Sequence, residues 1–244
     1  MRAHSPRAAL TDADTVLLPI RCAATARLRG FEVLSCEPGS DAYGPAAAHQ
    51  LAKVLLGDVA SLIAGHGLRL WIPLSLDALR RDDSAVVLFD GLTATALAGT
   101  NITFELGAND ILTGTASSNV LAALTGLDAH IAVSVLSDFG SIEAALLADA
   151  RISEVRLPAA WCGKAPPPGC QWHPEECWVA ETVECLHGRG LLASALDVSD
   201  FKLCHEIIVA GFDLIQGDVV GRPNSVEATV DQMVAALPFG RTLL

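Results

Sequence analysis

The sequence predicts a single α/β domain built as a (β/α)8 barrel. Eight short runs are rich in β-branched and other apolar residues, and runs with apolar residues at three- and four-residue spacing lie between most of them. Most of the eight runs are almost continuously apolar, which is typical of strands buried on both faces. Eight such units in 244 residues favour one barrel. A doubly wound open sheet is the alternative, but the phosphate-binding patterns GxGxxG and GxxxxGKS/T are absent from the sequence.

The expected elements follow one another in a regular order. The predicted strands cover 15–20, 30–36, 69–76, 101–107, 131–139, 152–158, 191–198 and 212–219. The predicted helices cover 45–66, 117–130, 174–190, 200–211 and 225–237. Pro174 suits a first helical turn, and Gly190 and Gly211 mark helix ends. Asn224 or Ser225 can cap the last helix.

The domain organisation is simple. We expect residues 1–14 to form an N-terminal extension and residues 15–244 to form the barrel domain. The first residues lack the apolar core of a signal peptide. No stretch of 18 residues is both apolar and uncharged, so we expect no membrane span. A soluble cytoplasmic protein is the expectation.

The charge balance is acidic. The chain has 16 Lys and Arg residues against 28 Asp and Glu residues, a formal net charge of −12. Nucleic-acid binding depends on clustered Lys and Arg that neutralise phosphates, and the chain has no basic run. The composition therefore excludes nucleic acid as an expected partner.

The cysteines raise one question of metal binding. Seven cysteines in a chain without an export signal indicate reduced thiols. The spacing of Cys170, His173 and Cys177 could reach one zinc ion, but the paired CxxC pattern of structural zinc sites is missing. Both interpretations remain open at this stage.

Polar residues lie at the carboxyl ends of the predicted strands, where a barrel carries its chemistry. These residues are Glu32, Ser75, Glu105, Ser137, Asp138, Arg156, Asp197 and Gln216. The carboxylates of Glu32, Glu105 and Asp138 come from three strands and could together bind a hard cation such as Mg²⁺. In an unrelated barrel enzyme, Glu32 and Glu105 could instead form an acid–base pair.

These strand ends, in this order, resemble the EAL domain family of bacterial cyclic-di-GMP phosphodiesterases. The matching segments are LPI at 18–20, GFEVL at 30–34, ELGA at 105–108, SDFG at 137–140, VRLP at 155–158 and QGDVVGRP at 216–223. The resemblance extends from about residue 15 to residue 237 and implies an EAL-type barrel. It also implies that Glu32, Glu105, Asp138, Arg156 and Gln216 converge at one mouth of the barrel.

The resemblance implies a two-metal phosphodiesterase site, and this chain departs from it. Active members hold the metals through the Glu of EAL, an Asn on the next strand, the first Glu of ExTE and the Asp pair of DDFG. Pro73 stands at the Asn position and Ser137 at the first Asp. Ala108 replaces the second Glu of ExTE, while Arg156 and Pro158 replace the Lys and Asp of IKID. A two-metal site needs several anionic ligands, so we expect no catalytic residues and no bound metal.

The remaining family positions are also altered. Leu196 and Ser199 align with the two Glu positions of the AEGVE motif, with Asp197 close by. Leu18 and Cys36 replace the Gln and Arg that the family uses to bind cyclic-di-GMP. The residues left as a remnant or ligand-binding site are Glu32, Leu34, Glu105, Asp138, Arg156, Gln216 and Pro223.

Three functions remain, and they differ in class. The first is a catalytically inactive EAL-type signalling protein that acts through a protein partner in bacterial regulation of motility, biofilm formation or a similar process. The second is a receptor that binds cyclic-di-GMP without hydrolysing it. The third is a residual phosphodiesterase. No cofactor is expected, and Mg²⁺ or Mn²⁺ would be needed only if activity is retained.

Overall fold

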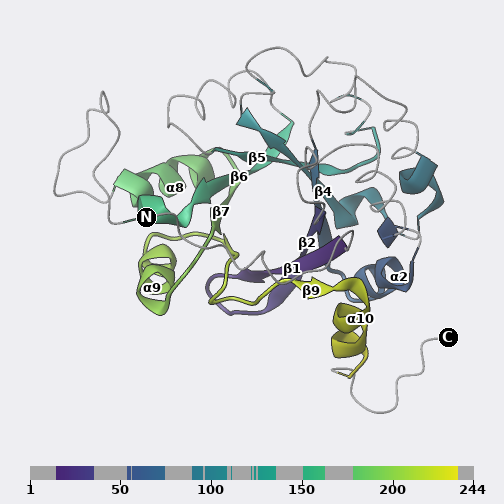
Figure 1. Cartoon of the computed structure of the whole chain (residues 1–244). Coiled ribbons are helices and arrows are strands. Elements are labelled where there is room, and N and C mark those ends of the chain that lie inside the picture. Colours follow the sequence, from purple (N-terminus) through teal and green to yellow (C-terminus); the bar gives the residue numbers. More distant parts are fainter. Residues whose placement is uncertain are drawn as a thin grey trace.

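The computed structural model is a closed barrel with helices on its outside (Figure 1). It describes residues 15–35, 54–55, 57–74, 90–95, 97–108, 111, 122, 124, 126–135, 151–162 and 178–235. The strands are β1 (Thr15–Cys22), β2 (Leu28–Ser35), β3 (Arg69–Leu74), β4 (Ile102–Gly107), β5 (His130–Ser134), β6 (Ile152–Pro158), β7 (Leu192–Leu196), β8 (Leu214–Ile215) and β9 (Asn224–Ser225).

The strand order closes the barrel through its first strand. Neighbouring strands from β2 to β8 pair in parallel, and β1 pairs antiparallel with β2, β8 and the short β9. The predicted barrel is therefore confirmed, with one refinement. β1 and β2 form a hairpin through the turn at 23–27, so no crossover helix separates them.

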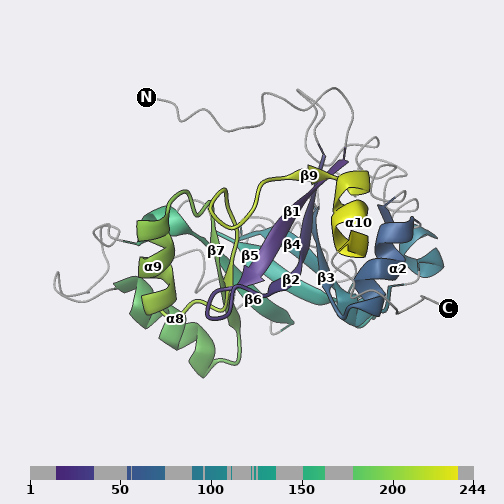
Figure 2. The same ribbon diagram turned by 90° about the horizontal axis from the view of Figure 1, so that it is seen from below.

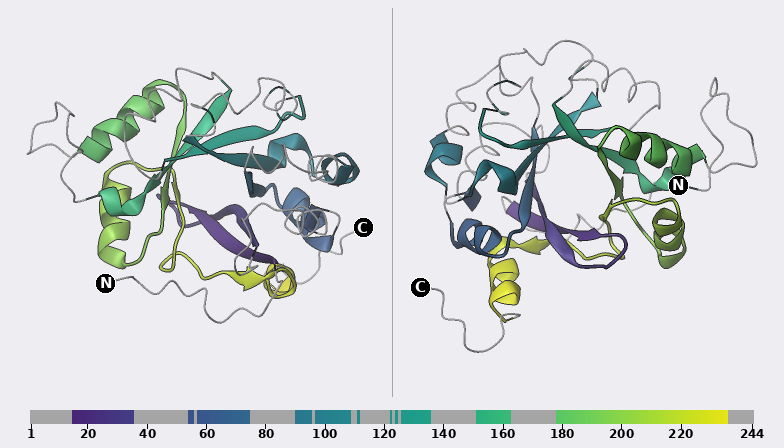
Figure 3. Two further views of the ribbon diagram at one scale, coloured as in Figure 1. Left: turned by 45° about the horizontal axis from the view of Figure 1, so that its top comes forward. Right: turned by 180° about the vertical axis from the view of Figure 1, so that it is seen from behind.

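The helices lie around the outside of the sheet (Figures 2 and 3). They are α2 (Asp58–Gly65), α8 (Trp178–Gly188), α9 (Phe201–Val209) and α10 (Val226–Ala235), with the 3-10 turns η2 (Gly99–Asn101) and η3 (Ala159–Trp161). The Ser225 hydroxyl accepts a hydrogen bond from the Ala228 amide at 3.1 Å, which confirms the predicted cap of the last helix. Gly190 and Gly211 follow α8 and α9 with positive φ angles, as predicted.

Several predicted boundaries are wrong or lie outside the described residues. The helix predicted over 117–130 does not reach residue 130, because 126–128 form a turn and His130 begins β5. The strand predicted over 212–219 shortens to Leu214–Ile215. Gly217 then turns the chain against the Val198 backbone, where a side chain would collide. Pro174, the start of helix 45–66 and the ends of strands 69–76 and 131–139 lie outside the described part of the chain.

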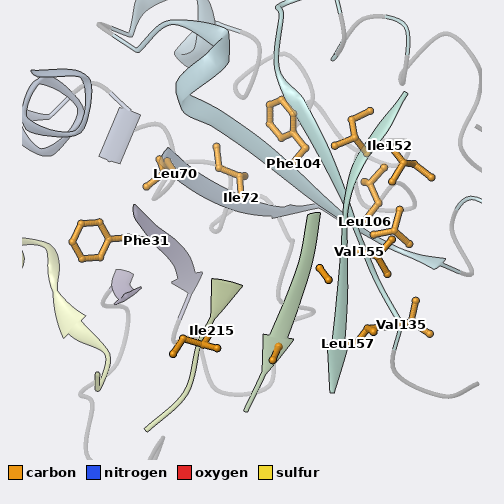
Figure 4. Close-up of a cluster of buried hydrophobic side chains, with 14 of the residues drawn as sticks. Phe31, Leu70, Ile72, Phe104, Leu106, Val135, Ile152, Val155, Leu157 and Ile215 are labelled. Carbon is orange, nitrogen blue, oxygen red and sulfur yellow. The ribbon is translucent and has the colours of Figure 1, made fainter. Parts of the chain in front are cut away.

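Strand residues alternate between two apolar environments. Leu70, Ile72 and Leu74 of β3 face outward into the large core between sheet and helices, part of which is shown in Figure 4. Trp71 faces inward and packs with Ile20 and Leu214 inside the barrel. This alternation places every second residue of a strand in the barrel lumen, where Glu32, Glu105, Glu154 and Arg156 meet.

None of the helices that the structure describes is long and apolar enough to cross a membrane.

Candidate functional site

The site is organised by β6, whose residues Glu154 and Arg156 both point into the barrel. The two residues are two positions apart, so they share the inner face, while Val155 and Leu157 belong to the outer core. Glu154 and Arg156 are each only 1% exposed. An acidic and a basic side chain therefore lie next to each other along one strand inside the barrel, and each has its own set of hydrogen-bond partners.

The side chains that bond to Arg156 lie toward the carboxyl ends of the strands. We call this group the mouth cluster: Arg156, Glu32, Glu105 and Gln216. Its Nη2 atom lies 3.0 Å from a Glu32 carboxylate oxygen and 2.5 Å from Gln216 Oε1. Its Nη1 atom donates to Glu105. Gln216 Nε2 also donates to Glu32 at 2.6 Å. One guanidinium thus joins side chains from β2, β4 and the end of β8.

The mouth cluster lies toward the carboxyl end of the parallel strands, and its carboxylates reach the solvent. The side chains of Glu32 and Glu105 are 12% and 11% exposed. A guanidinium is permanently charged and its donors form a planar fork suited to carboxylates. With one cation against two carboxylates, the cluster keeps an excess of one negative charge.

The side chains that bond to Glu154 lie deeper in the barrel. We call this group the inner cluster: Glu154, Trp71 and Ser194. Trp71 Nε1 donates to Oε2 of Glu154 at 3.0 Å, and the Ser194 hydroxyl donates to Oε1 at 2.5 Å. Arg156 Nε lies 3.9 Å from the same Oε1 and, among the described residues, has no hydrogen-bond partner. The Glu154 carboxyl group therefore lies next to the guanidinium, on the side away from the mouth.

Burial raises the pKa of Glu154, although the hydrogen bonds from Ser194 and Trp71 and the charge of Arg69 oppose the shift. Farther toward the amino ends of the strands, burial lowers the pKa of Arg69 despite its attraction to Glu154. Burial also lowers the pKa of His130, and Arg69 adds to the shift. Acidic and basic side chains thus alternate from Glu32 and Glu105 through Arg156 and Glu154 to Arg69.

The sequence interpretation did not single out Glu154. A signal was present, since the charged residues Glu154 and Arg156 stand at i and i+2 in a mostly apolar strand, which predicts that they share one face. The partners Trp71 and Ser194 carried no signal of their own. Both lie within strands β3 and β7 that are far from β6 in sequence.

Four of the five residues expected at one mouth are brought together there: Glu32, Glu105, Arg156 and Gln216. The fifth, Asp138, lies outside the described residues with Ser137, Ser75, Cys36 and the Cys170, His173 and Cys177 set. Cys22, Cys185 and Cys204 are free thiols.

The other altered positions lie around the mouth cluster. Pro73 is beside Glu105 in the β3–β4 register, and Leu18 is opposite Glu32 in the β1–β2 register. Ala108 is buried just after β4, and Pro158 ends β6. The remaining positions are half-buried or exposed: Leu34, Leu196, Asp197, Ser199 and Pro223. Asp197 is exposed and has a φ of 59°, in the left-handed region.

The described residues do not fit a divalent cation. Within the described ranges, no group of three or more His, Cys, Asp and Glu side chains is arranged to hold a metal ion. Glu32 and Glu105, which the sequence resemblance assigned to metal binding, both contact the Arg156 guanidinium. The neighbouring Pro73 side chain offers no ligand atom.

Comparison with known proteins supports the fold. The sequence matches no protein-family profile, and no curated protein matches it. Among solved structures, the EAL enzyme Bd1971 bound to cAMP and cyclic-di-GMP superposes with a TM-score of 0.73 at 14% identity. That match covers 91% of this chain, which spans 65% of the Bd1971 chain.

Two further structures cover whole EAL domains. The EAL domain of Mycobacterium smegmatis DcpA has a TM-score of 0.71 at 14% identity, covering 92% of this chain and 99% of that one. The EAL domain of Pseudomonas aeruginosa FimX bound to c-di-GMP has a TM-score of 0.64 at 17% identity, covering 86% and 90%. The chain therefore has the fold of EAL domains, and the predicted resemblance is confirmed at the level of the fold.

Proposed function

We propose that this chain is a catalytically inactive EAL-type domain that acts in the bacterial cytoplasm through a protein partner, in regulation of motility, biofilm formation or a similar process. The observation that carries the proposal is the placement of Arg156. Its guanidinium bonds to both Glu32 and Glu105, the two carboxylates that a metal-dependent site would need. A permanent cation in this position takes the place of a divalent metal.

The placement of Arg156 resists displacement. To admit a metal between Glu32 and Glu105, the guanidinium would have to leave both carboxylates while remaining inside the barrel. Uncoupling a buried ion pair typically costs about 3–5 kcal/mol, since the charge that remains loses its partner. A metal would also meet the repulsion of the buried cation. Metal-dependent hydrolysis is therefore disfavoured.

The charge of the mouth cluster also bears on the ligand. Cyclic-di-GMP carries two phosphodiester charges, and the cluster has one more negative than positive charge. Without metals to bridge them, the two repel each other. The receptor function is therefore the second candidate. It is supported by the similar fold of the FimX EAL domain, which was solved bound to c-di-GMP.

The test of this proposal is titration calorimetry of the full chain with cyclic-di-GMP in the presence of Mg²⁺ or Mn²⁺, with chromatography for the linear dinucleotide. We expect neither binding nor cleavage. Cleavage would overturn the proposal. Binding without cleavage would leave the domain inactive but assign it to the receptor class.

A metal titration tests the role of Arg156 directly. The wild type should take up no Mn²⁺ at the mouth. Arg156→Ala removes the guanidinium and frees Glu32 and Glu105, so it should bind Mn²⁺, whose preferred ligands are oxygens. Arg156→Ala with Glu105→Gln is the matched control and should lose that binding. Mn²⁺ uptake by the wild type at Glu32 and Glu105 would contradict the argument.

A further inference from the structure

The barrel has a second end, opposite the mouth cluster, where the parallel strands begin. Arginines gather at this end from segments that are far apart in the sequence. They lie just before β2, within β2, at the start of β3, and just before β6 and β7: Arg27, Arg29, Arg69, Arg151 and Arg189. The chain as a whole carries a formal net charge of −12. Cations gathered at one end of an acidic protein make that end the place where anions are attracted.

Two basic side chains of this end face the barrel lumen. Arg69 lies on the same side of β3 as Trp71, whose indole is inside the barrel. His130 begins β5, and the next residue, Ile131, belongs to the outer core, so the imidazole faces inward. Arg69 and His130 are both half-buried. Along β3, Trp71 lies between Arg69 and the level of the mouth cluster, so the two ends of the lumen are separate.

The basic side chains at this end are near one another and lack counter-ions. Gly30 is beside Arg69 in the β2–β3 register, which brings Arg29 next to Arg69. In the described part of the chain, the side chains of Arg29, Arg69 and His130 form no hydrogen bond or ion pair. Burial lowers the pKa of Arg69, and Arg29 adds to the shift while Glu154 opposes it. Burial and the charge of Arg69 lower the pKa of His130. An anion between these groups would relieve their repulsion.

The carboxylates near this end have other partners or face the solvent. Glu154 is buried and belongs to the inner cluster. The Asp213 carboxylate accepts from a backbone amide of β7 at 2.8 Å and lies 2.9 Å from a histidine ring of α8. Asp128 is exposed in the turn before β5. None of these three carboxylates forms an ion pair with Arg29 or Arg69, so both guanidiniums are available to a ligand.

A neutral donor lies on the same part of the lumen wall. Thr103 is on the inner face of β4, beside Trp71 in the β3–β4 register and beside His130 in the β4–β5 register. It is fully buried, yet its hydroxyl has no hydrogen-bond partner among the described residues. An unpaired buried hydroxyl is costly. An acceptor oxygen that enters from the amino ends of the strands would satisfy it.

We infer that the amino-terminal end of the barrel lumen binds a phosphate group through Arg29, Arg69 and His130. The two guanidiniums donate from neighbouring strands, and a phosphate has enough oxygens and charge to accept from both, whereas a carboxylate has two oxygens and one charge. Neutral His130 can accept the proton that phosphate carries near neutral pH and that sulfate lacks. The inference is independent of the proposed function, because the mouth cluster lies at the opposite end of the barrel.

A nuclear magnetic resonance titration of the full chain, which follows the arginine side-chain signals at constant ionic strength, tests the inference. The probes are inorganic phosphate, glycerol phosphate, sulfate and acetate. Inorganic phosphate should bind with a dissociation constant on the order of 1 mM, sulfate about five-fold more weakly, and acetate more weakly still. Tighter binding of glycerol phosphate would assign the phosphate to a monoester, and weaker binding to the free ion. No binding of phosphate, or equal binding of sulfate, would overturn the inference.

Substitutions locate the phosphate. Arg29→Gln and Arg69→Gln should each weaken phosphate binding by about ten-fold, because each removes a charge-assisted donor. Arg189→Gln is the matched control, since it removes an exposed cation from the same end of the barrel and should change binding by less than about two-fold. Arg29 is exposed, so its variant is expected to fold, and circular dichroism checks this. Equal losses for all three variants would reduce the effect to net charge and overturn the inference.

Discussion

The mouth cluster and the inner cluster are built around neighbouring positions of β6, yet they differ in how their charges are matched. In the inner cluster, two neutral donors, from Trp71 and Ser194, serve the single carboxylate of Glu154 away from solvent. In the mouth cluster, one guanidinium serves two carboxylates that are partly exposed. In the inner cluster, neutral donors satisfy the hydrogen-bonding groups of the buried carboxyl. In the mouth cluster, the balance of charge depends on one cation.

The two clusters therefore differ in what the loss of their central residue does. A cluster with a single cation changes its character when that cation is lost, because the carboxylates around it become free to bind something else. A cluster held by neutral donors has no such alternative, so its loss lowers stability alone. Arg156 therefore determines whether Glu32 and Glu105 are free to bind another group, whereas Glu154 contributes to stability.

The largest effect is expected for Arg156→Ala. It leaves Glu32 and Glu105 facing each other without a cation, which should lower the free energy of unfolding by about 3–5 kcal/mol. Urea unfolding measures this loss, and Mn²⁺ should restore part of it by binding the freed carboxylates. Lys202→Ala, which breaks an exposed ion pair of α9, is the control and should cost no more than about 1 kcal/mol. Equal losses for the two variants would contradict the central role of Arg156.

A somewhat smaller effect is expected for Glu154→Leu, which replaces the carboxyl group with an apolar side chain of similar size. It leaves the Trp71 and Ser194 donors without an acceptor, at a cost of about 2–4 kcal/mol in unfolding free energy. Adding Ser194→Ala should recover part of this loss, since an unpaired donor is then removed. If the double variant is the sum of the two single losses, the coupling inferred here is wrong.

A smaller loss of unfolding free energy is expected for Gln216→Leu. Gln216 accepts from Arg156 and donates to Glu32, so its loss should cost about 1–2 kcal/mol without freeing either carboxylate from the guanidinium. Unfolding measurements should therefore show little effect of Mn²⁺ on this variant. Stabilisation by Mn²⁺ as strong as for Arg156→Ala would show that the glutamine, and not the arginine, keeps metal out.

The smallest difference is expected in the pH dependence of the inner cluster. Burial raises the pKa of Glu154 above its ordinary value of 4.5, so the folded state favours the protonated carboxyl. The wild type should therefore be most stable relative to Glu154→Gln below pH 4.5 and lose that advantage as pH rises through the raised pKa. Thermal unfolding of both proteins across pH 4 to 8 checks this. A relative stability that rises with pH would reverse the assignment.

The mouth cluster was largely predictable, because its residues come from strand ends that meet at the same edge of a barrel. Glu32, Glu105, Arg156 and Gln216 were expected at one mouth, and hydrogen bonds join them there. Their mutual contacts were not predictable. The resemblance predicted that Arg156 lies at the mouth, and the structure adds that its guanidinium contacts both Glu32 and Glu105.

The inner cluster was not predicted, since its partners are distant in sequence and each residue is ordinary in its own strand. The Trp71 indole reaches Glu154 across the lumen, where Gly30 on the neighbouring strand leaves room for it; a side chain at Gly30 would collide with Trp71 and the Arg69 backbone. Propensity and periodicity act along one segment, and neither reports which side chains meet across a closed barrel.

The class of this fold follows from local sequence patterns. The period of apolar residues and the spacing of turn residues are local properties, and they define where strands and helices form. Contacts across the closed barrel are needed to explain the antiparallel hairpin of β1 and β2, the shortening of β8 to two residues, and the position of Arg156 between Glu32 and Glu105. Barrel closure brings segments more than a hundred residues apart into contact, and the chemistry of the mouth follows from that closure.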